Sequence, residues 1–423
     1  MTDEIPSGAV HRRHIGGSAF GLAIGALAQA AISRPAGAQA PSLGTAEVRP
    51  LAAGISYRMI GRWDVARLNR ILSVDTPAFA GTPVTYSAAR HAVRLYRVSY
   101  PSVVPERNNR PVVLSGLVAV PESGEASLPL LSYQHGTVYG KEEVPSFPEQ
   151  SPETQLMIAQ FAAQGYALIG ADYIGMGESA EPQGYMVKGS HQQATSDLIP
   201  AARAVLADLG KTESGLFISG WSQGGYVTMA LLERLEQTGI AVRAAATASA
   251  PVDLWVGLNG FLNFPRPNDA PWISTIFILS AFSYENYYGV PGLARSLIRP
   301  EHFDITQRAY RGRAVDPARI PTDLRSLISA EYFDPNFFAE SAFGRLAAAN
   351  HVYRWIVRTP VRNYYGESDE AISVGLARLA QEFQRALGND KVEAISTGDS
   401  THRGTFARAV PYWKQWFDSL PRA

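Results

Sequence analysis

The stretch Gly220-Trp221-Ser222-Gln223-Gly224 determines which fold this chain is expected to adopt. It follows a strand-like run at residues 215–219 and precedes a helix-like run at residues 226–235. In a strand–turn–helix unit of this kind, the glycines allow a sharp turn that lifts the serine hydroxyl out of the backbone at the carboxyl end of a sheet. A serine in that position is open to substrate and suited to act as a nucleophile.

Strand-like and helix-like runs alternate on both sides of this motif. The expected strands are residues 93–100, 111–121, 128–134, 166–171, 215–219, 244–250, 361–365 and 392–396. The expected helices are residues 151–164, 192–209, 226–235, 374–387 and 408–420. This alternation predicts an α/β fold with a mostly parallel central sheet and helices on both of its faces.

The alternation breaks after Pro251. Between Trp255 and Trp355, roughly 18 aromatic residues occur in about 100 positions, whereas aromatics make up 10% of the whole chain. Part of this set is expected to form the core of a helical insertion, and the remainder an apolar wall over Ser222. We therefore expect a core at residues 91–253 and 359–423, interrupted by a helical cap at 254–358. Residues 41–90 show no clear period and are expected to form an irregular N-terminal arm with one or two short helices.

The first 40 residues resemble an export signal. Arg12-Arg13 forms a twin arginine, a weakly apolar stretch follows to about Ile32, and Ala38-Gln39-Ala40 offers a small-x-small cleavage site. We therefore expect residues 1–40 to be removed from a periplasmic or secreted protein, by the twin-arginine or the ordinary secretory route, with no stable membrane anchor.

The composition excludes several classes of function. The 38 basic and 38 acidic residues balance, so no field of one sign exists to bind nucleic acid. The chain has no cysteine, which rules out disulfides and thiol chemistry. At 423 residues, the chain can bury a large core without such cross-links.

Three residues have the side chains that serine catalysis needs. A serine hydroxyl needs a base to take its proton and an acid to orient that base. Ser222, Asp369 and His402 each follow an expected strand, so all three should meet at one edge of the sheet. We predict that Ser222 is the nucleophile, Asp369 the acid and His402 the base.

These motifs together resemble the α/β-hydrolases, and most of all the secreted lipase/esterase group. The matching segments cover roughly residues 90–420 apart from the insertion. They are residues 133–137 (Tyr-Gln-His-Gly-Thr), 171–177 (Ala-Asp-Tyr-Ile-Gly-Met-Gly), 220–225 (Gly-Trp-Ser-Gln-Gly-Gly), 365–369 (Tyr-Gly-Glu-Ser-Asp) and 402–404 (His-Arg-Gly). The resemblance is specific for the fold and gives little information about the substrate.

Each role has a rival residue. His351 is an alternative base, although it precedes the strand that should carry the acid. Glu367 is an alternative acid, and Asp369 itself could be a helix N-cap. Asp399 lies close to His402 in sequence but is expected to shape that loop instead.

The attacked carbonyl oxygen becomes an anion that needs two preset N–H donors. The first should be the backbone of Gln223, and the resemblance implies a second donor in the loop after His135-Gly136, at Thr137. Gly136 and Trp221 are further candidates for oxyanion or substrate contact. His135 is expected to hold this loop in place, and residues 141–148 are candidate pocket-lining residues.

No cofactor or metal is expected. Residues 175–180 match the dinucleotide pattern Gly-x-Gly-x-x-Ala, but residues 181–184 (Glu-Pro-Gln-Gly) break the helix that should bind the pyrophosphate. The eight histidines form no His-Glu-x-x-His motif.

We therefore predict an exported serine hydrolase that cleaves hydrophobic carboxylic esters, small or polymeric, through an acyl-enzyme on Ser222. A serine peptidase and a hydrolase of carbon–carbon bonds in β-diketones, such as oxidised polymers, would use the same triad. A non-catalytic binding protein on this scaffold is the alternative from another class.

Overall fold

The computed structural model describes residues 47–420. The export signal expected at residues 1–40 lies outside this range. No helix within residues 47–420 has both the length and the apolar character needed to cross a membrane.

The described part of the chain is built on a ten-stranded sheet in the order β1-β2-β3-β4-β6-β5-β7-β8-β9-β10. The strands are β1 (Arg49–Pro50), β2 (Ser56–Trp63), β3 (Val93–Val104), β4 (Arg110–Pro121), β5 (Ser127–Gln134), β6 (Ala167–Ala171), β7 (Thr212–Trp221), β8 (Ala244–Ala248), β9 (Val361–Tyr365) and β10 (Val392–Ser396). The pairs from β1 to β6 are antiparallel, and all pairs from β6 to β10 are parallel. The sheet is therefore mostly parallel where the candidate site lies, as the sequence predicts.

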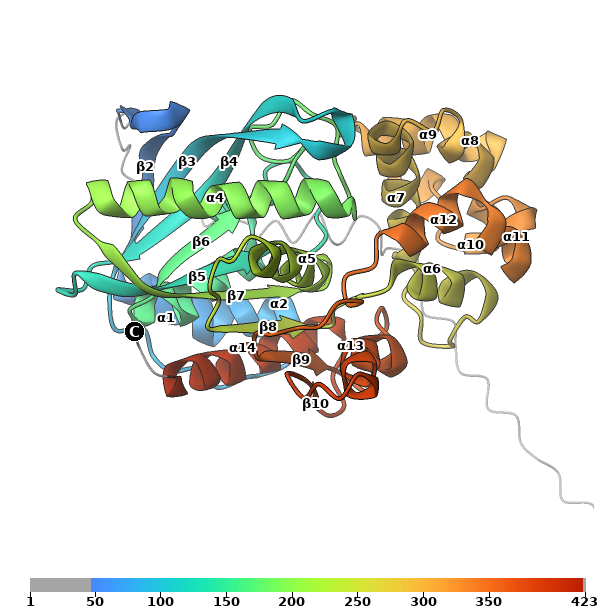
Figure 1. The fold of residues 1–423 in the computed structure, drawn as a ribbon. Helices are drawn as coiled ribbons and strands as arrows, with labels where there is room; N and C mark the ends of the chain where they lie inside the picture. The colour runs from blue at the N-terminus through green and yellow to red at the C-terminus, as the bar shows by residue number, and fades with distance from the viewer. Residues whose placement is uncertain (1–46, 421–423) are drawn as a thin grey trace, which may run out of the picture. The chain divides into compact units, whose positions relative to one another are not determined.

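Helices cover both faces of the sheet (Figure 1). One face packs against α4 (Lys188–Asp208) and α5 (Gln223–Gln237), and the other against α14 (His402–Ser419) with α3 (Pro152–Gln160). Alternate strand residues enter different cores: in β7, Ile218 belongs to the first and Phe217 to the second. The remaining helices outside the insertion are α1 (Val65–Arg70), α2 (Thr76–Ala80) and α13 (Val374–Ala386).

Between β8 and β9 the chain forms helices and an isolated antiparallel bridge between Ile298 and Ile328 (Figure 1), and we call residues 254–349 the cap. Its helices are α6 (Leu254–Asn263), α7 (Ile273–Tyr288), α8 (Leu293–Leu297), α9 (Pro300–Tyr310), α10 (Leu324–Leu327), α11 (Pro335–Glu340) and α12 (Ala342–Ala349). Phe343 is fully buried and contacts Phe277 and Tyr284, so much of the aromatic content forms the cap's own core. The Tyr287 hydroxyl donates to the carbonyl of Pro182 (2.6 Å), which ties α7 to the loop after β6.

Two local expectations are wrong. Residues 56–63 lie in the arm expected to be irregular, but they form β2, which pairs antiparallel with β3 through a register shift between Met59 and Gly61. That shift disturbs the alternation that marks a strand in sequence. His402, expected in a loop before a helix near residue 408, is the first residue of α14, because Thr401 caps that helix by accepting from the Gly404 amide (3.2 Å).

Candidate active site

Ser222 occupies the turn between β7 and α5 in a backbone conformation that side chains rarely adopt, with φ 56° and ψ −120°. A Cβ on Gly220 would lie 2.2 Å from the carbonyl oxygen of Gly224, and a Cβ on Gly224 would lie 1.9 Å from that of Gln134. Both glycines are therefore required by close backbone contact. The Ser222 amide donates to Ala248 (2.9 Å), which fixes the turn against the end of β8.

Asp369 and His402 form a buried pair, 2% and 4% exposed. Nδ1 of His402 lies 3.0 Å from both carboxylate oxygens of Asp369. Asp369 also accepts from the Ala371 and Ile372 amides (2.8 Å each) and from the Ser249 hydroxyl (2.6 Å).

These contacts determine the charge state of Asp369. Burial alone would raise the pKa of Asp369, but the attraction of His402 and the donated hydrogen bonds outweigh it and hold the pKa below its ordinary value. Asp369 can therefore orient the His402 ring as an ionised carboxylate, with Nδ1 as the donor and Nε2 left free.

The structure brings His402 to the residue beside Ser222. The indole nitrogen of Trp221 donates to the His402 carbonyl (3.2 Å), and the two rings lie 5.0 Å apart. Within residues 47–420, the Ser222 hydroxyl makes no hydrogen bond to His402. Catalytic hydrogen bonds of this kind are often long in unliganded enzymes and tighten when substrate binds.

The two expected oxyanion amides belong to Gln223 and Thr137. Neither amide donates to another described residue, and Gln223 is the first residue of α5, where amides lack helical partners. The Gly136 amide, in contrast, donates to Glu153 (2.9 Å), so it is not free to bind an oxyanion. The Trp221 ring stacks on Phe406 at 5.0 Å and packs beside His402.

His135 holds the loop of Gly136 and Thr137 in place. It is 1% exposed, and its ring stacks on Tyr173 with centroids 4.0 Å apart. Nδ1 lies 2.8 Å from the Gly136 carbonyl, and burial lowers the pKa of His135 to about 4. A neutral imidazole in this position is a structural group.

The glycine-rich loop after β6 packs on its own neighbours. A Cβ on Gly177 would lie 2.2 Å from the Asp172 carboxylate, which itself accepts from Ser115 (2.5 Å). The next helix along the chain, α4, begins only at Lys188, so it does not start within this loop.

The alternative base and acid, His351 and Glu367, and the nearby Asp399 contact residues outside the Asp369–His402 pair. His351 packs on Tyr353 with ring centroids 5.8 Å apart. Glu367 accepts from Ser396 (2.7 Å), and Asp399 accepts from Ser368, which joins two loops. Among the described residues, none of these three bonds to His402.

A narrow cavity opens onto Ser222. Its volume is about 40 Å³, enough for a few waters. Its walls are mostly apolar and come from the core (Tyr185, Met186, Pro251), the cap (Leu254, Leu258, Phe261, Trp272, Ile276, Ser280) and the segment after β9 (Ala371, Ile372, Leu376). None of residues 141–148 lines it, contrary to expectation.

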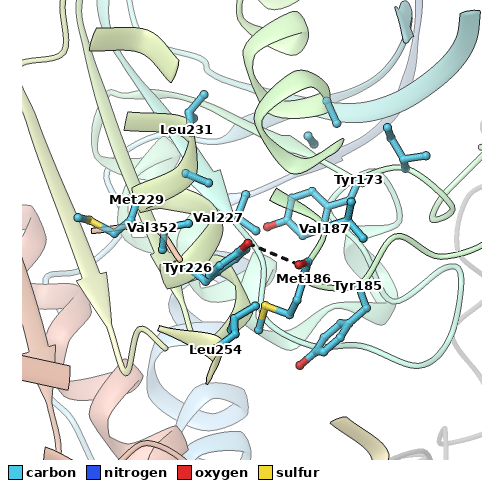
Figure 2. Close-up of a cluster of buried hydrophobic side chains, with 14 of the residues drawn as sticks. Tyr173, Tyr185, Met186, Val187, Tyr226, Val227, Met229, Leu231, Leu254 and Val352 are labelled. Atoms are coloured by element: carbon cyan, nitrogen blue, oxygen red, sulfur yellow. Dashed lines mark hydrogen bonds between the residues drawn. The ribbon is translucent and has the colours of Figure 1, made fainter. Parts of the chain in front are cut away.

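Figure 2 shows a cluster of buried side chains that includes Tyr185, Met186 and Leu254 of the cavity wall. Tyr226, one turn into α5, directs its hydroxyl at the carbonyl oxygen of Met186 (3.5 Å). Tyr226 is fully buried, and Met186 has a positive φ of 54°. This contact fixes the segment that carries Tyr185 and Met186 against the helix that starts after Ser222.

The profile of the Prolyl oligopeptidase family matches residues 152–258, which include Ser222. Among solved structures, a proposed hydrolase from Legionella pneumophila has a TM-score of 0.77 and 20% identity, covering 87% of this chain and 98% of that one. The rice cell wall degrading esterase LipA from Xanthomonas oryzae has a TM-score of 0.72 and 19% identity (86% and 97%). Candida antarctica lipase A in its closed state has a TM-score of 0.60 and 15% identity (86% and 83%). The chain has the α/β-hydrolase fold. No curated protein sequence matches it.

Within this α/β-hydrolase fold, sequence reasoning missed four residues that support the site. Ser249 binds Asp369, Glu370 accepts from the His402 amide (2.8 Å), and Arg266 donates to the Asp369 carbonyl (3.1 Å). Trp272 lines the cavity and lies 5.8 Å from the His402 ring. Ser249 could have been found from the sequence, because it directly follows β8 as the triad candidates follow their strands. Arg266 and Trp272 belong to the cap, whose docking has no local signature.

Proposed function

We propose that this chain is an exported serine hydrolase that cleaves carboxylic esters through an acyl-enzyme on Ser222. One observation carries the proposal: Ser222 sits at a sharp strand–helix turn and lines an apolar cavity, and the preceding residue, Trp221, contacts a histidine bound to a buried carboxylate. The esterase and lipase among the structural neighbours support the same class of chemistry.

In the proposed reaction, Oγ of Ser222 attacks the ester carbonyl carbon while Nε2 of His402 takes the hydroxyl proton. The amides of Gln223 and Thr137 stabilise the oxyanion. His402 then gives the proton to the leaving alcohol, and Asp369 stabilises the imidazolium. Water, activated by His402, attacks the acyl-enzyme and releases the acid and free Ser222.

The cavity favours an apolar acyl group. Leu258, Phe261 and Ile276 would contact an aliphatic chain, whereas no charged side chain lines the cavity to bind a charged group. A small or polymeric hydrophobic ester is therefore the proposed substrate, and closed walls around it would exclude water.

A serine peptidase is the second candidate, because the family match is to the Prolyl oligopeptidase family. The matched residues, 152–258, include the nucleophile turn but neither Asp369 nor His402. An ester has a better leaving group than a peptide, so the same site would cleave an ester more readily.

The test uses p-nitrophenyl esters of rising acyl length, a peptide anilide and a β-diketone, each with wild type and the Ser222→Ala variant. We expect Ser222-dependent turnover of esters, with little turnover of the other two. Cleavage of the anilide or the diketone without any ester turnover would reject the esterase proposal.

Export is proposed from the N-terminal sequence. The mature N-terminus, read by mass spectrometry from the periplasm or medium, should begin near Pro41. Replacing Arg12 and Arg13 with Lys should block export by the twin-arginine route, and full-length protein retained inside wild-type cells would contradict export.

A further inference from the structure

A buried carboxylate, Glu153, lies beside the loop that carries Thr137. Glu153 is 5% exposed and belongs to the first turn of α3. A carboxylate at this position can stabilise the N-terminus of a helix and need have no other role. Its contacts, however, are with other parts of the chain.

One oxygen of Glu153 accepts two hydrogen bonds. The Tyr133 hydroxyl donates to it at 2.6 Å from β5, and the Gly136 amide donates at 2.9 Å from the loop after β5. The space beside Gly136 is filled as well, because a Cβ on Gly136 would lie 3.1 Å from the Trp221 ring and 3.4 Å from a carboxylate oxygen of Glu153. Gly136 is therefore packed closely against both Glu153 and Trp221, the residue that precedes Ser222.

We propose that Glu153 is a positioning residue that fixes Gly136 so that the next amide, that of Thr137, faces the oxyanion formed on the Ser222-bound substrate. The inference rests on the proposed function. Oxyanion donors act because they are already oriented when charge develops, and a displacement of about 1 Å can lower the rate about 10²-fold.

The burial of this group supports a specific role. Burial raises the pKa of Glu153 to about 7, and the hydrogen bonds from Tyr133 and Gly136, then the charges of Arg403 and His402, act in the opposite direction. Glu153 in turn contributes to the raised pKa of the buried Tyr173, after burial itself. A group needed only to fill space would be better replaced by an apolar one.

The experiment separates acceptor position from charge. Glu153→Gln keeps the side-chain length and an acceptor oxygen, whereas Glu153→Asp keeps the charge but withdraws the acceptor by one methylene. Glu153→Ala removes both. Glu149→Ala is the matched control, because Glu149 is a nearby, exposed carboxylate that accepts from Trp63 (3.1 Å) and Arg67 instead of the loop.

Each variant is compared with wild type on an ester, with active sites counted by a fluorophosphonate. We expect kcat per active site to fall about 10- to 100-fold in Glu153→Asp and Glu153→Ala, with KM changed less than about threefold. Glu153→Gln should stay within about fivefold of wild type, and Glu149→Ala should match it. Inhibition by a trifluoromethyl ketone, whose adduct carries an oxyanion, should weaken in proportion to kcat.

The proposal is overturned if Glu153→Asp keeps wild-type kcat per active site, or if Glu153→Gln loses as much as Glu153→Asp. Equal kcat per active site with only a lower melting temperature would show a structural role alone. If Glu153→Ala does not fold, the comparison of kcat between Glu153→Asp and Glu153→Gln still tests the proposal. Wild type without Ser222-dependent ester turnover would instead reject the proposed function, and the phosphonate labelling of Ser222 distinguishes the two failures.

Discussion

The backbone amide of His402 donates to the carboxylate of Glu370 at 2.8 Å, while the ring of the same histidine is bound by the preceding residue, Asp369. Two adjacent carboxylates thus hold one histidine at its backbone and at its side chain. Since His402 begins α14, the Glu370 contact also satisfies an amide that has no helical partner.

This arrangement predicts different effects for the two carboxylates. Asp369→Asn should lower kcat about 10⁴-fold, because the amide no longer selects the tautomer with Nδ1 as donor. Glu370→Ala should lower kcat only a few-fold and cost about 1 kcal/mol of stability, the usual range for a lost hydrogen bond at a helix N-terminus. Steady-state kinetics and thermal melting measure both, and equal kinetic losses would contradict the division of roles.

The backbone conformation of Ser222 predicts that replacing it lowers activity but can raise stability. Ser222→Ala should lower kcat at least about 10³-fold. Ser222→Gly should be equally inactive but more stable than Ser222→Ala by about 1 kcal/mol, because glycine adopts φ 56° and ψ −120° without strain. Thermal melting of the two variants side by side tests this, and a less stable glycine variant would count against a strained turn.

The glycines of the turn predict a failure to fold. Gly224→Ala would place a Cβ 1.9 Å from the Gln134 carbonyl, so we expect little soluble protein. Gly375→Ala is the control, since nothing lies within 4 Å of its Cβ and alanine favours helix α13, by up to about 1 kcal/mol. Soluble yield and melting temperature should both fall in Gly224→Ala and both rise in Gly375→Ala.

Glu153 predicts a pH-dependent contribution to stability. Its pKa is about 7 in the folded state and 4.5 ordinarily, so the folded state binds the proton more tightly and this contribution falls as pH rises from about 4.5 to about 7. Glu153→Gln does not ionise, so its free energy of unfolding relative to wild type should rise over that interval, by about 3 kcal/mol at most. Urea unfolding at pH 5 and pH 8 measures the difference, and an unchanged difference would mean that Glu153 ionises normally.

The cap predicts the acyl length that the cavity accepts. Leu258→Ala should enlarge the cavity and move the best p-nitrophenyl ester to longer chains, at about fourfold in kcat/KM per added CH₂. Val256→Ala, at an exposed position of the same helix, is the control and should leave the profile unchanged. An unchanged profile for Leu258→Ala would mean that the acyl chain leaves this cavity elsewhere.

The sequence predicts the parallel half of the sheet well because its strands are continuous apolar runs bounded by turn residues. It fails at β2, where a register shift at Met59 disturbs the pattern, and at His402, where the cap is a single threonine. The order of Ser222, Asp369 and His402 could be inferred because each follows a strand or precedes a helix. The contacts of Glu153, Arg266 and Trp272 are between segments distant in sequence, so no local pattern reports them.

Two hydrogen bonds join the cap to the loop that carries Asp369 and Glu370. Arg266 donates to the Asp369 carbonyl (3.1 Å), and the Ala270 amide donates to the Glu370 carbonyl (2.9 Å). The segment that shapes the cavity is thus also a support of the residues that hold His402. We therefore expect substrate range and turnover to change together in this protein. Selection for a new substrate through residues 264–272 is expected to change the rate of the chemical step as well, so that further changes near Asp369 would be needed to restore it.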